Sequence, residues 1–318
     1  MNRQRVRRWA LRISAAVLFL VLAGATYQGV ATALERRAYP RPGGMVDVGG
    51  HQLHIMCAGE GYPLVVLEAP AAGFSASWAA VQSRAAQHTR VCSYDRAGLG
   101  YSERSDAAYD PADAPRELRT LLAQANEAAP YIIAGHGLGA SFATAFASMF
   151  PDDVRALILV DPPRTGEVPT EPRALFAAPA ALPWLARVGL LRATATLSAL
   201  VPDLPPPSAD VLRALLNRPD HLSRTAEEIA RWTDAEALAT TDGVGTGIRI
   251  THLATSGDRR ASLALPEPHA SRVVAVIQDE VARLRTDSGE EAKENGAAFG
   301  ESHAPGETGG GVPRVRSR

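Results

Sequence analysis

Short apolar runs and helical patterns alternate along the first half of the chain. Three apolar runs lack the alternation of a half-exposed strand: 64–67, 131–134 and 156–160. A fourth run, 90–94, is more mixed. Such runs are typical of strands covered on both faces of a parallel sheet. Helical patterns separate them at 77–87, 114–128 and 140–150. This order predicts a doubly wound, mostly parallel α/β sheet with right-handed crossovers.

The patterns on either side of this core are different. Residues 46–55 predict a hairpin that turns at Gly49-Gly50. From about 164 to 245, helical segments punctuated by proline occur without strands, which predicts a helical cap inserted between two strands. A strand at 249–254 and an amphipathic helix at 271–285 complete a folded domain that we place at 45–285. Glycine, glutamate, serine and proline dominate 286–318, which predicts a disordered tail.

An uncharged apolar run of 22 residues, Ile13 to Leu34, lies near the N-terminus within 1–35. At about 1.5 Å per residue it is long enough to cross a bilayer core of roughly 30 Å. A cleaved signal peptide is the alternative, because small-x-small sites occur at 23–25 and 31–33. We favour a retained single-pass anchor, since the run exceeds a typical signal-peptide core. Arginines before the run place the folded domain outside the cytoplasm, at the cell membrane or secreted if the segment is cleaved.

Composition and motifs give no indication of nucleic acid, a metal or a dinucleotide as a partner or cofactor. The chain is 46% hydrophobic and 21% charged, as in a globular protein. A formal net charge of −1 gives no electrostatic basis for binding nucleic acid. No histidine pair or Cys-x-x-Cys spacing indicates a metal, and no Gly-x-Gly-x-x-Gly follows a strand. We therefore expect neither a metal nor a dinucleotide cofactor.

The segment Gly135-His136-Gly137-Leu138-Gly139 lies between a predicted strand and a predicted helix, where small flanking residues let a sharp turn close. It resembles the Gly-His-Ser-Leu-Gly nucleophile elbow of α/β hydrolases, with Gly137 in place of serine. Residues 95–102 resemble the family's Asp-x-Gly-x-Gly-x-Ser loop, and 67–73 fall where the family builds half of its oxyanion hole. The chain thus resembles membrane-anchored bacterial α/β hydrolases over roughly 46–163, and the resemblance implies an α/β-hydrolase sheet with a helical cap.

The same resemblance indicates that catalytic groups are missing. Gly137 has no side-chain oxygen, so the acyl-enzyme route of a serine hydrolase is closed. Where the family often reads Gly-Asp-x-Asp after the seventh strand, Arg260 takes the place of the acid, and Asp258 or Asp161 could stand in. The stretch 256–270 is too short for a further helix, an eighth strand and their turns. We therefore expect the eighth strand and its histidine loop to be deleted, with His269 as the nearest candidate histidine.

Other groups near the elbow have supporting roles at most. The resemblance assigns the oxyanion-hole donors to the backbone N–H groups of Ala71 and Leu138, although Pro70 stands where the family commonly has glycine. We interpret His136 as structural rather than as a base. Ser141 lies one turn into the following helix, pointing away from the usual site. His252, inside a predicted strand, is expected to be a core residue.

The resemblance also predicts how the two cysteines are placed. Cys57 and Cys92 would lie on antiparallel neighbouring strands of the family's sheet, which predicts a disulfide suited to an extracytoplasmic domain. Two buried free thiols are the alternative.

Three functions remain open from the sequence. In the first, the chain is a degenerate, inactive hydrolase homologue with a capped apolar pocket for a small ligand or partner. In the second, it is a working hydrolase of an ester or acyl substrate with a non-standard catalytic set. In the third, it is a cofactor-free lyase or isomerase that uses His136, Asp161 or His269. We favour the first, because the nucleophile, the acid position and the histidine loop are all altered. The cap residues expected to shape the pocket are apolar: Trp184, Leu185, Leu191 and Trp232.

Overall fold

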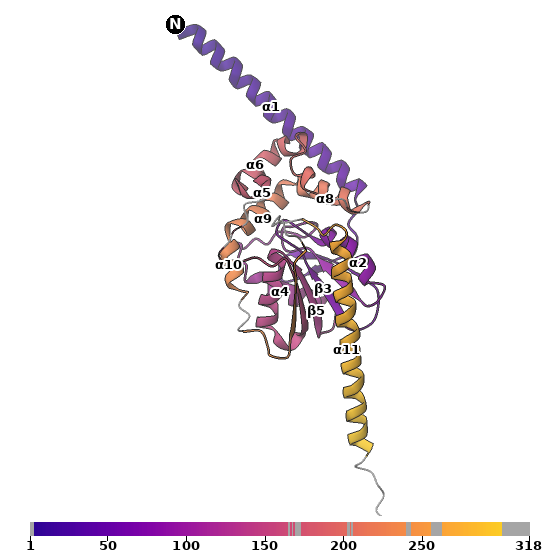
Figure 1. Ribbon diagram of the computed structural model, residues 1–318. Helices are drawn as coiled ribbons and strands as arrows, with labels where there is room; N and C mark the ends of the chain where they lie inside the picture. The colour runs from indigo at the N-terminus through magenta and orange to yellow at the C-terminus, as the bar shows by residue number, and fades with distance from the viewer. Residues whose placement is uncertain are drawn as a thin grey trace, which may run out of the picture.

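A seven-stranded sheet runs through the centre of the domain in the computed structural model (Figure 1). The structure describes residues 3–164, 166, 168, 173–201, 204, 206–239, 243–255 and 263–300. The strand order is β1-β2-β4-β3-β5-β6-β7. The strands are β1 (Gly44–Asp47), β2 (Gln52–Ala58), β3 (Leu64–Glu68), β4 (Val91–Tyr94), β5 (Tyr131–His136), β6 (Val154–Val160) and β7 (Arg249–Leu253).

The sheet confirms the predicted fold class. β1 and β2 form the predicted hairpin, and β2 pairs antiparallel with β4. All other neighbours are parallel. Within the described residues the sheet ends at β7, so no eighth strand follows it there.

Helices cover both faces of the sheet, because alternate residues of each strand face opposite layers. Val65 and Leu67 of β3 pack in the layer that contains α2 and α11, whereas Leu64 and Val66 pack in the layer of α3 and α4. These helices are α2 (Ala79–Ala85), α3 (Asp113–Gln124), α4 (Leu138–Met149) and α11 (His269–Gly300). A short 3-10 helix, η1 (Ser75–Trp78), precedes α2.

Short helices lie between β6 and β7, in the stretch where the sequence predicts a cap, and are called the cap below. Prolines stand in the first turns of α6 and α9, where a missing N–H costs no helical hydrogen bond. The predicted segments divide into shorter elements, which are α5 (Arg173–Phe176), η3 (Pro179–Ala181), α6 (Leu182–Arg187), α7 (Leu190–Ala193), η4 (Ser198–Leu200), α8 (Ser208–Leu216), α9 (Pro219–Ala230) and α10 (Trp232–Ala237). One further 3-10 helix, η2 (Pro151–Asp153), precedes β6.

The N-terminal apolar run lies inside one long helix, α1 (Arg3–Ala38). It is long and apolar enough to cross a membrane, and its apolar residues are exposed. Figure 1 shows the second half of α1 passing over the cap and the first half leading away from the domain. A membrane span and a signal sequence both fit this helix by length and composition.

The structure differs from the sequence predictions in two elements. Helix α11 continues to Gly300 instead of ending at 285, because residues 290–298 include three glutamates, three alanines and a lysine, which favour helix. Residues 301–318 of the predicted tail lie outside the described residues. His252 is exposed rather than in the core, because β7 is the outer strand of the sheet.

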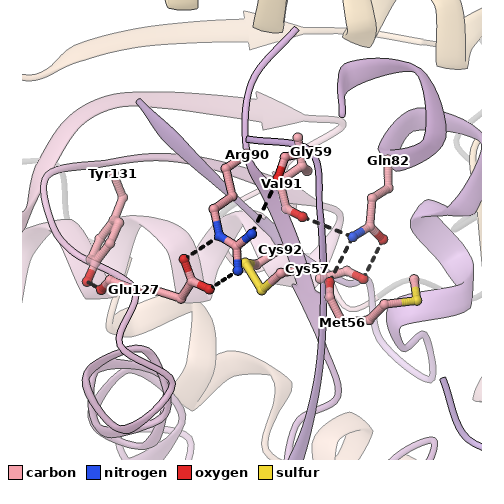
Figure 2. The surroundings of a disulfide bond; sticks show 10 residues. Met56, Cys57, Gly59, Gln82, Arg90, Val91, Cys92, Glu127 and Tyr131 are labelled. Atoms are coloured by element: carbon pink, nitrogen blue, oxygen red, sulfur yellow. Dashed lines mark hydrogen bonds and ion pairs between the residues drawn. A yellow bond between two sulfur atoms is a disulfide. The ribbon is translucent and has the colours of Figure 1, made fainter. Parts of the chain in front are cut away.

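Cys57 and Cys92 face each other across β2 and β4 and form a disulfide in the structure. Figure 2 shows this bond beside the ion pair of Arg90 with Glu127, whose nitrogen and oxygen lie 2.5 Å apart. The bond joins the hairpin to the parallel part of the sheet. Such a bond is typical of proteins outside the cytoplasm.

We expect thiol counting on the denatured chain to find no free thiol before reduction and both cysteines free after it. The reason is that the two residues oppose each other in the register of β2 and β4. A Cys57→Ser variant, which leaves one thiol free in both conditions, is the control. Two free thiols without reductant would show that both side chains are reduced.

Candidate active site

The turn between β5 and α4 has the shape of a nucleophile elbow. Gly137 occupies its apex with φ 53° and ψ −125°. The flanking glycines are required by close backbone contacts: a Cβ on Gly135 would lie 2.7 Å from the Cα of Ala140, and one on Gly139 would lie 2.5 Å from the carbonyl oxygen of Glu68. The sharp turn therefore depends on small residues at 135 and 139, as the sequence predicts.

Gly137 itself has room for a side chain. Apart from its chain neighbours, the one described atom within 4 Å of a Cβ built there is the Cβ of Pro70, at an ordinary 3.5 Å. The backbone conformation at Gly137 is one that residues with a Cβ adopt only under strain. Glycine at this position removes that strain and leaves no oxygen to act as a nucleophile.

The residues predicted to form the oxyanion hole lie under the cap. Ala71 and Leu138 belong to one buried apolar cluster together with Phe142 of α4 and Trp232 of α10. Phe176 of α5 packs against Trp232 edge to face, with ring centroids 5.8 Å apart. Apolar side chains of the cap therefore pack in one cluster with the oxyanion residues.

Asp161, a candidate acid, is engaged by a residue beyond β7. One carboxylate oxygen accepts a hydrogen bond from the backbone N–H of Thr255 at 2.8 Å, and the other accepts one from the Thr255 hydroxyl. Both oxygens are thus used to hold the chain after β7 against the end of β6. Asp258 and Arg260 lie outside the described residues.

Two of the described histidines, His136 and His269, are candidates for a general base at the elbow. Burial lowers the pKa of His136 to about 4, despite the opposing effect of the Asp161 charge. The ring is therefore neutral at physiological pH, and it packs edge to face against Trp78. His269 lies in the first turn of α11, and its buried Nδ1 has no hydrogen-bond partner among the described residues. Ser141 lies inside α4 and is buried.

A buried ion network behind the elbow was not predicted from the sequence. Arg96 donates to Glu68 at the end of β3, at 2.6 Å, and to Glu228 of cap helix α9, at 2.8 Å. It also donates to the carbonyl oxygens of Ala69 and Pro70. All three charged side chains are almost completely buried. Arg96 thus ties the cap to the segment that begins the oxyanion region.

The carboxyl group of Glu68 has a second partner in this network. The Tyr94 hydroxyl donates to it, and burial raises the pKa of Glu68. Burial lowers the pKa of Arg96, but the charges of Glu228 and Glu68 outweigh this effect and hold that pKa well above its ordinary value. The guanidinium is therefore charged at all physiological pH values.

His221 makes a second polar contact between the cap and the loops below it. Its Nδ1 accepts a hydrogen bond from the Gly100 N–H at 3.0 Å, so its Nε2 carries the proton and donates to the Ala72 carbonyl oxygen, also at 3.0 Å. Burial lowers the pKa of His221 to about 4, which keeps this tautomer neutral. His221 and Glu228 stand seven residues apart on α9, so one face of this helix is fixed to the domain.

Beneath the cap, a cavity of about 20 Å³ lies beside this network. Its size suits a single water molecule rather than a substrate. Its lining mixes alanines with polar and charged side chains, including Arg96, Tyr109, Glu117 and Arg224. Of the cap residues expected to shape a pocket, Trp184 faces solvent, whereas Leu191 and Trp232 are buried.

Comparison with known proteins shows to which protein family the chain belongs. The model of the α/β-hydrolase family matches residues 59–302, which is most of the chain. The chain belongs to the α/β-hydrolase family. Its fold is similar to that of solved α/β hydrolases such as a putative lipase from Acinetobacter baumannii, with 17% identity, a TM-score of 0.57 and coverage of 82% of this chain and 97% of that one. At this level of identity the likeness shows the fold alone.

Relatives in the α/β-hydrolase family match shorter stretches. A 2-hydroxy-6-oxo-2,4-heptadienoate hydrolase of Pseudomonas putida is 28% identical over 120 residues, 37% of this chain and 44% of the relative. The human (lyso)-N-acylphosphatidylethanolamine lipase is 33% identical over 121 residues, 37% of this chain and 35% of the lipase. The chain thus spans less than half of the length of these curated relatives.

Proposed function

We propose that this protein is a degenerate α/β hydrolase without serine-hydrolase activity, held at the cell membrane by α1 with its domain outside the cytoplasm. The observation that carries the proposal is Gly137 at the apex of an elbow whose flanking glycines and backbone turn are kept. A nucleophile is thus missing from a site that has room for one. The scaffold then serves to bind a small apolar ligand or a partner rather than to turn a substrate over.

Two further observations support the loss of activity. Both carboxylate oxygens of Asp161 accept hydrogen bonds from Thr255, and no histidine among the described residues donates to this acid. The cap side chains Trp232 and Phe176 pack in the same apolar cluster as the oxyanion residues Ala71 and Leu138. An apolar ligand matches the chemistry of these side chains.

A working hydrolase with a substituted catalytic set is the second candidate. It is favoured by the relatives, which are named as a hydrolase and a lipase. Ser141 is the hydroxyl closest to the elbow in the following helix, and a surrogate nucleophile would have to come from there. Its burial within α4 argues against this role.

Labelling by an active-site fluorophosphonate, together with turnover of short p-nitrophenyl esters, separates the two candidates. We expect the unmodified chain to take up no label and to hydrolyse no ester, because position 137 offers no oxygen. A serine hydrolase treated in parallel shows that the reagents are active. Label and turnover that both disappear in Ser141→Ala would show that the protein is a working hydrolase.

A further inference from the structure

The second half of α1 is packed tightly against the corner between α6 and α7 of the cap. A Cβ on Gly24 would collide with the carbonyl oxygen of Val188, and one on Gly189 would lie 2.7 Å from the carbonyl oxygen of Gly24. The buried Gln28 side chain donates to the Asn217 carbonyl oxygen at 2.8 Å. The two backbones therefore approach closely only because both contact points are glycine.

Polar contacts fix the same interface farther along α1. Arg192 of α7 donates from Nε to Gln28 at 3.0 Å and forms an ion pair with Glu35. The Arg192 side chain is largely buried in this contact. The position of the cap along the axis of α1 is therefore set by specific residues.

The distance along α1 between Trp9 and Tyr27 is close to the thickness of the hydrocarbon core of a bilayer. Trp9 is 58% exposed and Tyr27 is 49% exposed. Their separation of 18 positions corresponds to about 27 Å at about 1.5 Å per residue, close to the hydrocarbon core of roughly 30 Å. This segment begins before the apolar run at 13–34 and ends within it, because Gln28 and Glu35 in the last part of α1 contact the cap. Tryptophan and tyrosine are enriched at the two membrane interfaces. The Arg12 guanidinium lies 5.8 Å from the Trp9 ring, so its charge reaches toward the same end of the helix.

The cap contact lies at the outer end of this span. Gly24 precedes Tyr27 by one helical turn, so the α6–α7 corner lies at or just below the level of Tyr27. Trp184 on α6 is 69% exposed and Leu190 on α7 is 48% exposed. The Arg187 guanidinium lies over the Trp184 ring, 5.0 Å from its centroid. Exposed aromatic and apolar groups beside an arginine suit the headgroup layer.

We propose that the α6–α7 corner, through Trp184, Arg187 and Leu190, lies in the headgroup layer of the same bilayer that α1 crosses. This inference rests on the proposed membrane anchoring. The bilayer is the occupant of this surface because Trp184 and Leu190 flank Val188 and Gly189, the residues that contact Gly24 of α1. The cap is then held against the lipid, and an apolar ligand from the bilayer reaches it without crossing water.

Tryptophan quenching in the full chain tests this placement. The chain is reconstituted into phosphatidylcholine vesicles with and without bromine on the acyl chains near the headgroup. Trp9→Phe leaves Trp184 as the reporter, Trp184→Phe leaves Trp9, and the double variant gives the emission of the buried Trp78 and Trp232. We expect brominated lipid to reduce the emission of both reporters relative to the double variant.

The two reporters distinguish the ways in which the proposal could fail. Quenching of Trp9 without quenching of Trp184 would overturn the placement of the cap and leave the anchor intact. Quenching of neither would overturn the anchoring itself, and the cap placement with it.

A pair of glycine variants in the Trp9→Phe background tests whether α1 sets the depth of the cap. Gly24→Leu collides with Val188, so the quenching of Trp184 is expected to be lost. In the Trp184→Phe background the same change leaves Trp9 quenched. Gly29→Leu is the control, because a Cβ there has nothing within 4 Å, and it keeps both signals. Full quenching of Trp184 in Gly24→Leu would overturn the role of the α1 contact.

Discussion

Replacing Arg96 by methionine is expected to lower the free energy of unfolding by about 3–5 kcal/mol, the range for breaking a buried ion pair by removing one partner. The change leaves Glu68 and Glu228 buried without a cation and removes the donor to the Ala69 and Pro70 carbonyl oxygens. Methionine keeps much of the apolar stem, so most of the loss comes from uncompensated charge. Equilibrium denaturation of the full chain in detergent measures it.

The loss in Arg96→Met should depend on pH. Without the arginine, burial raises the folded-state pKa of the two carboxyl groups above the ordinary glutamate value of about 4.3. The variant therefore loses stability as pH rises above that value, and its deficit shrinks below it. The control Arg213→Met removes an exposed i,i+3 pair with Asp210 and should change stability by no more than about 0.5 kcal/mol. Equal losses in both variants would contradict a special role for Arg96.

Replacing Gly139 by alanine is expected to destabilise the protein by about 3 kcal/mol, at the upper end of typical overpacking. In an exposed helix the same change would stabilise by about 1 kcal/mol. Here the new Cβ meets the carbonyl oxygens of Glu68 and Ala69, which are backbone atoms of the neighbouring strand and its following loop. The elbow would have to open to accept it.

Gly29→Ala in α1 is the matched helical control, because the added Cβ contacts nothing within 4 Å. It should not lower the melting temperature of the domain, whereas Gly139→Ala should lower it clearly. Thermal unfolding of the two variants beside the unmodified chain makes the comparison. If Gly139→Ala melted like the unmodified chain, the tight elbow described above would be wrong.

Local patterns were enough to predict the sheet and the elbow. The apolar runs of β3, β5 and β6 and the glycines at 135 and 139 are each defined within a few residues. The hairpin of β1 and β2 follows from Gly49-Gly50 in the same way. Strand periodicity and turn chemistry act over short distances, so the sequence alone reveals them.

Contacts between distant segments were not predictable in this way. Arg96 and Glu228 are 132 positions apart, and a glutamate on a cap helix looks like an ordinary surface residue until the cap is placed on the sheet. The role of His221 has no sequence signal for the same reason. The sequence predicts Trp184 in a pocket, but its side chain is exposed on α6. Each of these outcomes depends on tertiary packing, which has no periodic signature in the sequence.

Ester hydrolysis by the Gly137→Ser variant tests most directly whether the elbow has kept its shape and lost its chemistry. The added side chain fits, since its Cβ lies 3.5 Å from the nearest described atom outside its chain neighbours. We expect the folded variant to hydrolyse p-nitrophenyl esters no faster than the unmodified chain, because no histidine among the described residues hydrogen-bonds to Asp161 as a catalytic base would. Strong turnover by Gly137→Ser would contradict this, because it would require a working histidine and acid within reach of the elbow.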